Sequence, residues 1–247
     1  MLWRKAWVDT RWRFYIGMAV LIGFVFLVVL TEPWMVENLT IAPDDPRYEV
    51  FRWQTETVST YRGYVWLQWF FKVLPTWWVI FAVLMGVGGM VTDASRGAVL
   101  FTLSLPVTRR RLLGVSVATG AIKLMLLAIV PSLLISALSL VRGKVYPVTD
   151  TLAHSLLIVS SGFVFFIFSV MLTVIFESWW PAIIVAIAVL QFPLTGLKVV
   201  NPGVLPFLSG ESYFRDGSFP WPSVFISLAI SAAIYFLSVR ILERKDF

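Results

Sequence analysis

The chain has 247 residues, of which 59% are hydrophobic, 16% aromatic and only 14% charged, and its mean hydropathy is +0.84. A soluble globular protein is about 45–50% apolar and about 25% charged, so this chain has too few polar residues to cover a water-exposed domain. It contains no cysteine, which excludes a disulfide-stapled fold, a thiolate metal site and a cysteine nucleophile.

Six long, mostly uncharged runs divide the chain, and each is long enough for a membrane-spanning helix. A bilayer core about 30 Å thick needs about 20 apolar residues of helix, and continuous runs favour helices over the alternating strands of a barrel. The sequence therefore predicts an all-α integral membrane protein with one transmembrane domain, 1–247. The predicted spans lie near residues 14–31, 73–92, 115–141, 155–176, 178–197 and 219–239.

Basic residues are concentrated in alternate segments between these spans. With both termini in the cytoplasm, the inner segments hold 11 basic residues in 41 positions, whereas the outer segments hold 8 in 73 positions. Cytoplasmic loops carry the excess of Lys and Arg, so we expect cytoplasmic termini in a multi-pass protein of the cell membrane. This topology accounts for the net charge of +6 without a nucleic-acid partner.

Residues 1–13 precede the first span and predict an amphipathic helix. Trp3 and Trp7 recur at helical spacing on one side, with Arg4 and Arg11 towards the other. This pattern is typical of a helix that lies in the headgroup region with its aromatic side towards the lipid. A frayed basic tail that only sets the topology is the alternative.

Two longer segments face the outside in this topology. Residues 32–72 begin with a turn-rich connection and continue with aromatic residues at roughly helical spacing, which predicts an amphipathic helix on the outer leaflet. Residues 198–216 mix apolar residues with prolines and glycines. This segment is too broken for a span and too apolar for a free loop, so we expect a short re-entrant or outer-leaflet segment.

The inner segment 93–111 carries the most specific pattern in the chain. An apolar stretch ends at Pro106, Thr108 follows as a candidate helix cap, and three consecutive arginines come next. Most connections in compact domains have about 4–6 residues. Apolar surface that faces the cytosol is costly unless lipid or a partner protein covers it.

This segment resembles the inner loop of the type 2 ABC exporter permeases. That loop has an acidic residue, then Gly-Thr, then Leu-Leu-Ser-(Leu)-Pro-Val-Ser/Thr-Arg-Arg and an apolar helix. Asp93 stands where the family often has Glu, and Ala98 replaces the usual Thr. The matching residues are Gly97, Leu103, Ser104, Leu105, Pro106, Val107, Thr108, Arg109 and Arg110.

The resemblance implies a permease subunit whose loop 93–111 is the coupling helix that docks on a separate ATP-binding subunit. The coupling residues that it implies are Asp93, Arg96, Gly97, Leu103, Leu105, Pro106, Thr108, Arg109 and Arg110. The elbow helix that it implies carries Trp3, Arg4, Trp7 and Arg11.

The resemblance also implies an assembly of two permease subunits, the same or homologous, with two ATPase subunits, surrounded by membrane lipid. ATP and magnesium would be bound by the ATPase. The chain itself has no Gly-x-x-x-x-Gly-Lys-Ser/Thr phosphate loop, so we expect it to bind no cofactor and to be no enzyme.

Two other function classes stay open: an intramembrane enzyme, and an ion channel or secondary carrier. An enzyme needs a reactive constellation at membrane depth, and the only histidine, His154, lies at the outer mouth of the fourth span. A channel or carrier needs charged or polar residues along its pathway, for which the sequence offers Lys123 and Gln191. We interpret Lys123 as a snorkelling lysine, with pairing to Glu177 as the alternative.

Overall fold

The fold comes from a computed structural model, which describes residues 2–87, 108–176, 178, 180, 183–184 and 210–244. Within these ranges all regular structure is helical. The helices that are long and apolar enough to cross a membrane are Arg11–Leu30, Tyr61–Gly86, Arg109–Val141, Val148–Phe176 and Trp221–Arg244. The protein is therefore an all-α, multi-pass membrane protein. The predicted span near 178–197 lies almost entirely outside the described residues.

The chain begins with a short helix, α1 (Leu2–Asp9), which is followed by the first span, α2 (Arg11–Leu30). Thr10 separates them, because its backbone angles of φ −112° and ψ 8° leave the helical range. Two short helices follow α2, namely α3 (Glu32–Leu39) and α4 (Tyr48–Val58). A helix within the segment 32–72 is thus present as predicted.

The second span is a continuous helix with a wider central segment. It consists of α5 (Tyr61–Val65), the π-helix η1 (Trp66–Val73) and α6 (Leu74–Gly86). The hydrogen bonds of η1 join residues five apart, as between the Leu74 N–H and the Trp69 carbonyl. Leu74 is followed by a proline, which has no N–H and leaves a carbonyl of the preceding turn without its helical donor. Such π segments are rare in proteins.

The helix that contains the predicted second span begins about three helical turns before the predicted start at residue 73. Arg62 and Lys72 interrupt the uncharged run that marks a span. The helix tolerates these residues because Arg62 forms an ion pair with Asp150 and because Lys72 lies on the exposed side. Residues 61–72 therefore belong to the helix bundle.

The third and fourth spans are longer than a bilayer requires. α9 (Arg109–Val141) has 33 residues and α10 (Val148–Phe176) has 29. At about 1.5 Å per residue they are about 50 Å and about 43 Å long, whereas the hydrocarbon core is about 30 Å thick. The predicted starts at residues 115 and 155 mark only the apolar parts, and both helices begin earlier.

The described chain resumes at Gly210 with the short helix α13 (Glu211–Asp216) and the last span, α14 (Trp221–Arg244). Gly210 and Gly217 flank α13 with φ angles of +66° and +68°. Glycine enters this left-handed region without steric cost. α13 is the described part of the predicted outer segment 198–216, and α14 overlaps the predicted span 219–239.

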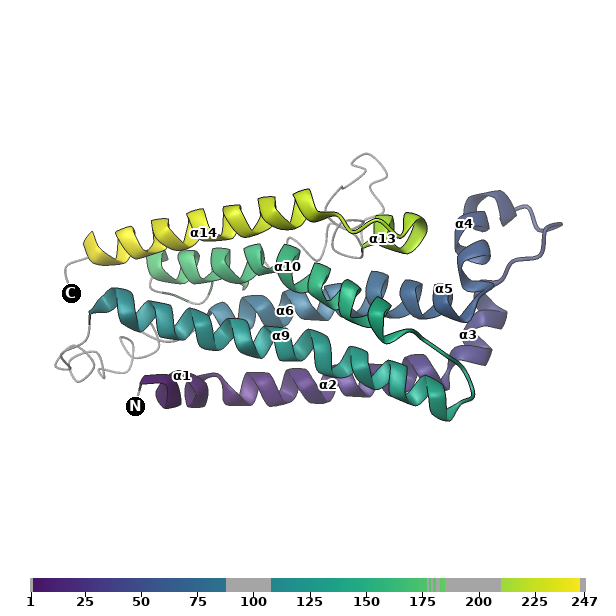
Figure 1. Ribbon diagram of the computed structural model, residues 1–247, viewed down its shortest axis with the longest axis horizontal. Helices are drawn as coiled ribbons and strands as arrows, with labels where there is room; N and C mark the ends of the chain where they lie inside the picture. The colour runs from purple at the N-terminus through teal and green to yellow at the C-terminus, as the bar shows by residue number, and fades with distance from the viewer. Residues whose placement is uncertain are drawn as a thin grey trace.

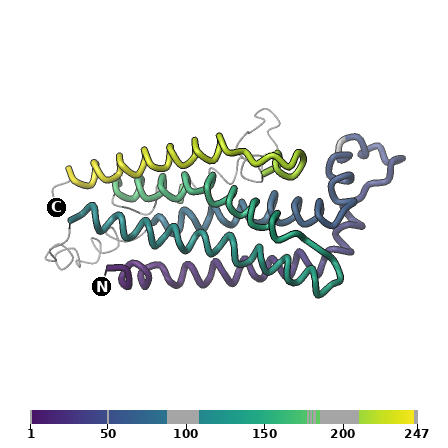
Figure 2. The backbone as a smooth tube through the Cα atoms, in the orientation of Figure 1, coloured from purple at the N-terminus to yellow at the C-terminus, as the bar shows by residue number. Residues whose placement is uncertain are grey.

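The long helices lie side by side along the long axis of the molecule (Figure 1). Both ends of the chain lie at one end of this bundle, which we call the terminal end, and α9 begins and α6 ends towards the same end (Figures 1 and 2). α3 and α4 lie at the opposite end, which we call the far end. α10 packs against α6, α9 and α14, and α2 packs against α6 and α9.

Glycines let the central helices approach closely. A Cβ atom at Gly162 of α10 would stand 2.3 Å from the Trp78 ring of α6. Trp78 is fully buried, and its indole N–H donates to the Leu124 carbonyl of α9 (3.0 Å). A Cβ atom would be similarly crowded at Gly86 and Gly120. α6, α9 and α10 thus form the tightly packed centre of the bundle.

Candidate functional sites at the two ends of the bundle

The predicted coupling residues are only partly described by the structure. Thr108, Arg109 and Arg110 lie at the start of α9, at the terminal end. The Thr108 hydroxyl accepts a hydrogen bond from the Arg111 N–H (3.4 Å), so the predicted helix cap is confirmed. The remaining predicted residues lie outside the described ranges: Asp93, Arg96, Gly97, Leu103, Leu105 and Pro106.

Arg109 connects the start of α9 to the end of α14. Its guanidinium Nη1 donates to the Leu242 carbonyl (3.4 Å) in the last turn of α14. The last four carbonyls of a helix have no donor within the helix, so a cation there satisfies an acceptor and complements the helix dipole. Arg110, in contrast, is exposed.

The predicted elbow residues lie on α1 and in the first turn of α2. Trp3, Arg4 and Arg11 are exposed, whereas Trp7 is half-buried and its ring lies against that of Phe14, with centroids 5.9 Å apart. α1 as a whole packs against α9 (Figure 1). A separate N-terminal helix is thus present, and its position in the headgroup region stays a prediction.

Lys123 is fully buried between α9 and α1. Its Nζ donates to the Trp7 carbonyl (2.7 Å) and to the Thr10 hydroxyl (2.6 Å), and it lies 4.5 Å from the centre of the Trp7 ring. The interpretation of Lys123 as a snorkelling lysine is wrong, because its ammonium binds the C-terminal end of α1. Glu177, the alternative partner, and Gln191 lie outside the described residues.

Arg13, in the first turn of α2, caps another helix at the terminal end. Its Nη1 donates to the Leu84 carbonyl (2.6 Å) and to the Val87 carbonyl. These carbonyls are the last acceptors of α6, directly before residues 88–107. No pattern in the sequence singles out Arg13, because its acceptors are backbone atoms more than 70 positions away.

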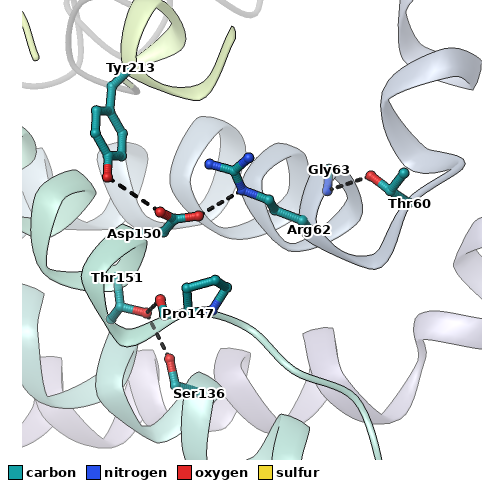
Figure 3. Close-up of polar contacts among 8 residues, drawn as sticks. All are labelled: Thr60, Arg62, Gly63, Ser136, Pro147, Asp150, Thr151 and Tyr213. Atoms are coloured by element: carbon teal, nitrogen blue, oxygen red, sulfur yellow. Dashed lines mark hydrogen bonds and ion pairs between the residues drawn. The ribbon is translucent and has the colours of Figure 1, made fainter. Parts of the chain in front are cut away.

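A polar cluster at the far end joins the second span, the fourth span and α13 (Figure 3). The Arg62 Nε donates to Asp150 Oδ2 (2.7 Å), and the Tyr213 hydroxyl donates to Asp150 Oδ1 (3.3 Å). Asp150 is only 6% exposed, whereas the Arg62 side chain is 47% exposed. Both carboxylate oxygens therefore have a donor, and the carboxylate is the buried centre of the cluster.

Aromatic rings hold α13 in the same place. The Phe214 ring stacks on the Trp66 ring with centroids 4.3 Å apart and planes 5° from parallel. The His154 ring stacks on Phe70 (4.8 Å) and meets the Tyr213 ring edge-on (5.3 Å). His154 is fully buried, so it forms part of the packing beneath α13.

Hydroxyl pairs add polar contacts between the spans near this cluster. The hydroxyls of Ser136 and Thr151 lie 2.7 Å apart, and the Thr151 hydroxyl also donates to the Pro147 carbonyl (3.2 Å; Figure 3). The Tyr61 hydroxyl lies 2.6 Å from Ser139 Oγ. Hydroxyl contacts between membrane helices contribute about 0.6 kcal/mol each on average, so together they help to fix the second, third and fourth spans.

Two buried polar groups have no hydrogen-bond partner within the part of the chain that the structure describes: Gln68 Nε2 and the Tyr146 hydroxyl. Tyr146 lies in the turn between α9 and α10 and is 2% exposed. Burial, and then the nearby Asp150 carboxylate, raise the pKa of Tyr146. The same two causes raise the pKa of Tyr213. The cluster therefore favours neutral phenols beside a single carboxylate.

Tyr146→Phe should stabilise the protein by about 1 kcal/mol at neutral pH, because it removes a buried hydroxyl that lacks a partner among the described residues. In the wild type, the raised pKa of Tyr146 means that stability is constant below the unfolded-state pKa of about 10 and falls as the pH rises above it. In Tyr146→Phe, the contribution of Tyr146 to the loss of stability above about pH 10 should be absent.

Thermal unfolding in detergent between about pH 8 and pH 11 measures both effects on Tyr146→Phe. Tyr61→Phe is the matched control and should be less stable than wild type, because the Tyr61 hydroxyl has Ser139 as a partner. A lower unfolding temperature for Tyr146→Phe at neutral pH would contradict the prediction.

Asp150→Asn should destabilise the far end by about 1–3 kcal/mol, because it removes the charge that Arg62 pairs with. The loss should be local, so hydrogen exchange should accelerate in Glu211–Asp216 of α13 more than in α9. Asp216→Asn, at an exposed position of the same helix, serves as the control and should leave exchange unchanged. Equal exchange in wild type and Asp150→Asn would show that the carboxylate does not hold α13.

The two ends of the bundle differ in chemistry. At the terminal end, cationic side chains donate hydrogen bonds to the carbonyls of helix ends. At the far end, one carboxylate accepts hydrogen bonds from donors on separate helices. The far-end cluster was missed from the sequence, although Asp150 and His154 lie one helical turn apart at the start of the fourth span. That spacing signals a polar helix face.

Comparisons with protein-family models, with curated proteins and with solved structures gave no match to this chain.

Proposed function

We propose that the chain is the permease subunit of an ATP-driven exporter of the type 2 ABC class, with residues 93–111 as its coupling loop. The observation that carries the proposal is where this loop leaves and re-enters the bundle. α6 ends and α9 begins towards the terminal end, where α1 packs against α9 (Figure 1), and the segment between α6 and α9 has the Leu-Ser-Leu-Pro-Val-Thr-Arg-Arg pattern of that class. An ATPase subunit would bind at this end.

The proposed topology has six crossings with both termini in the cytoplasm. Its support is the arrangement of the described helices: α10 (Val148–Phe176) ends towards the terminal end, whereas α13 (Glu211–Asp216) lies towards the far end (Figure 1). In the proposed topology, the connection between these two helices would include the remaining one of the six crossings. Residues 177–209 include an apolar run long enough for about 30 Å of helix.

Charge supports the proposed orientation. The basic residues described at the terminal end are Arg4, Lys5, Arg11, Arg13, Arg109, Arg110, Arg111, Lys123, Arg240 and Arg244. Acidic residues are fewer there, with Asp9 and Glu243 in the described part. Because segments rich in Lys and Arg stay in the cytoplasm, the terminal end would face the ATPase.

In this proposal two permease subunits, identical or homologous, form the translocation path and two ATPase subunits supply the energy. ATP and magnesium bind to the ATPase, because the permease sequence has no phosphate loop. Closure of the ATPase subunits on ATP would push on residues 93–111, tilt the second and third spans and change access to the path between the permeases.

Affinity purification of the chain in a mild detergent, from the cell that makes it, tests this proposal. We expect a protein with a Gly-x-x-x-x-Gly-Lys-Ser/Thr phosphate loop to co-purify in equal amount and to hydrolyse ATP. The absence of such a protein from gentle preparations would favour the enzyme or channel classes instead.

Substitutions in the loop sharpen the test. Gly97→Val, Leu105→Asp and Pro106→Ala should each reduce recovery of the ATPase by about tenfold or more, because a few interface residues carry most of the binding energy. Val145→Asp at the far end, where Val145 is 71% exposed, is the control and should leave recovery unchanged. Full ATPase assembly and full activity in all three loop variants would overturn the proposed role of residues 93–111.

A further inference from the structure

We propose that Arg13 and Lys123 are positioning residues that make the two helices flanking residues 88–107 move as one unit. The segment Trp7–Arg13, which we call the N-terminal clamp, is bonded to both of these helices. The proposal rests on the proposed function, because it concerns how a push on the loop would reach the spans.

The first bond of the clamp holds the helix before the loop. Arg13 Nη1 donates to the Leu84 carbonyl (2.6 Å) and the Val87 carbonyl at the end of α6. Four residues further along α2, a Cβ atom at Gly17 would stand 3.1 Å from the Phe81 ring of α6. α2 therefore packs closely on α6 just where Arg13 caps it, so the end of α6 cannot shift without disturbing the start of α2.

The second bond of the clamp holds the helix after the loop. Lys123 of α9 donates from Nζ to the Trp7 carbonyl (2.7 Å) and the Thr10 hydroxyl (2.6 Å). These acceptors are the end of α1 and the joint between α1 and α2. The ammonium is fully buried, and a charge taken out of water is strongly destabilised unless its partners stay in place. α9 and the clamp are thus held together.

The two bonds meet within one short segment of chain. Thr10 and Arg13 are three residues apart, which is less than one helical turn, so α6 and α9 are both bonded to nearly the same point. A push that separated α6 from α9 at the terminal end would break the hydrogen bonds of either Arg13 or Lys123. α1 and the start of α2 therefore have to move together with the flanking helices.

This arrangement predicts reciprocal effects in the permease alone. Arg13→Gln should accelerate hydrogen exchange at Val83–Val87, and through the clamp also at Leu2–Asp9 of α1. Lys123→Met should accelerate exchange at Leu2–Asp9, and through the clamp also at Val83–Val87. Each change should be about tenfold or more, because hydrogen bonds to charged groups are among the stronger ones and coupling between sites acts equally in both directions.

Two further variants separate positioning from general stability. Arg13→Lys keeps a cation that can reach the α6 carbonyls, so it should restore most of the protection at both places. Arg142→Gln removes the cation that caps the opposite end of α2, where Arg142 Nη1 donates to the Val29 carbonyl (2.5 Å). It should leave exchange at the terminal end unchanged. If Arg13→Gln affects only Val83–Val87, the clamp does not join the two helices and the proposal fails.

An experiment on the complex with the ATPase tests whether the clamp transmits movement of the loop to the spans. Because the chain has no cysteine, spin labels can be attached at Ser59→Cys and Ser218→Cys, two exposed far-end positions. Trapping the ATPase with MgATP and vanadate should change the distance between the labels in wild type and in Arg142→Gln. In Arg13→Gln and Lys123→Met the ATPase should bind and hydrolyse ATP while the distance change is lost.

The outcomes distinguish this inference from the proposed function. If no ATPase co-purifies, the proposed function fails, and the exchange experiment still decides whether the clamp joins α6 to α9. If the ATPase binds and the distance change persists in Arg13→Gln and Lys123→Met, the proposed function stands and transmission through the clamp is overturned.

Discussion

Gly162→Ala should destabilise the protein by about 1–3 kcal/mol, because it forces a methyl group into a packed core. The new Cβ atom would stand 2.3 Å from the Trp78 ring, which is fully buried and cannot swing into open space. α6 and α10 would have to separate, and the packing of both against α9 would suffer. Gly162→Leu should have a larger effect, up to loss of the folded bundle. Thermal unfolding in detergent measures both variants.

Gly23→Ala is the matched control for this prediction. Gly23 lies in α2, and a Cβ atom there would have nothing within 4 Å. The substitution should leave stability unchanged or raise it by up to about 1 kcal/mol, because alanine favours helix more than glycine does. Trp78→Phe should reduce the cost of Gly162→Ala, since the smaller ring leaves room for the methyl group. Equal costs at Gly162 and Gly23 would contradict the close approach of α6 and α10.

Gly210→Ala should release α13 from the far end, with a loss of about 2–4 kcal/mol from two causes that add. The φ angle of +66° is strained for alanine, and the new Cβ atom would stand 2.7 Å from Leu157 Cδ1 and 2.9 Å from His154 Nδ1. Hydrogen exchange in Glu211–Asp216 should accelerate, and the unfolding temperature should fall.

Gly217→Ala separates these two causes. Gly217 ends the same helix with a similar φ angle of +68°, but a Cβ atom there would meet nothing within 4 Å. It should cost only the backbone strain, about 1–2 kcal/mol. If both variants behave alike, the contact of α13 with His154 adds nothing to its docking.

The membrane class and most of the spans could be predicted because apolar runs are a local property of the sequence. Leu124–Val141 and Phe14–Leu30 are uncharged throughout, and both lie within long helices of the structure. The cap at Thr108 could be predicted for the same reason, since it depends on residues within a single turn.

The structural features that could not be predicted from the sequence depend on contacts between segments that are distant in the chain. Arg62 and Lys72 made the second span look shorter, because nothing local shows that Asp150 lies opposite Arg62 or that Lys72 lies on the exposed side of the helix. The sequence favours a snorkelling lysine at Lys123, because nothing local shows that α1 ends beside it. Arg13 binds backbone carbonyls, which every residue carries, so its role cannot be predicted from sequence patterns alone.

The π-helix η1 has a consequence for how the second span meets its neighbours. Each residue in an α-helix advances the direction of the side chains by about 100°, and hydrogen bonds between residues five apart fit an additional residue into the turn. If Trp66–Val73 were an ordinary α-helix and Trp78 kept its place beside Gly162, Arg62 would lie on a different side of the helix and would no longer face Asp150. The wide segment thus sets the phase between the two halves of one span. Deletion of one residue within it should leave an ordinary α-helix with both halves still aligned, whereas deletion of one residue from the regular helix α6 should rotate one half against the other by about 100°.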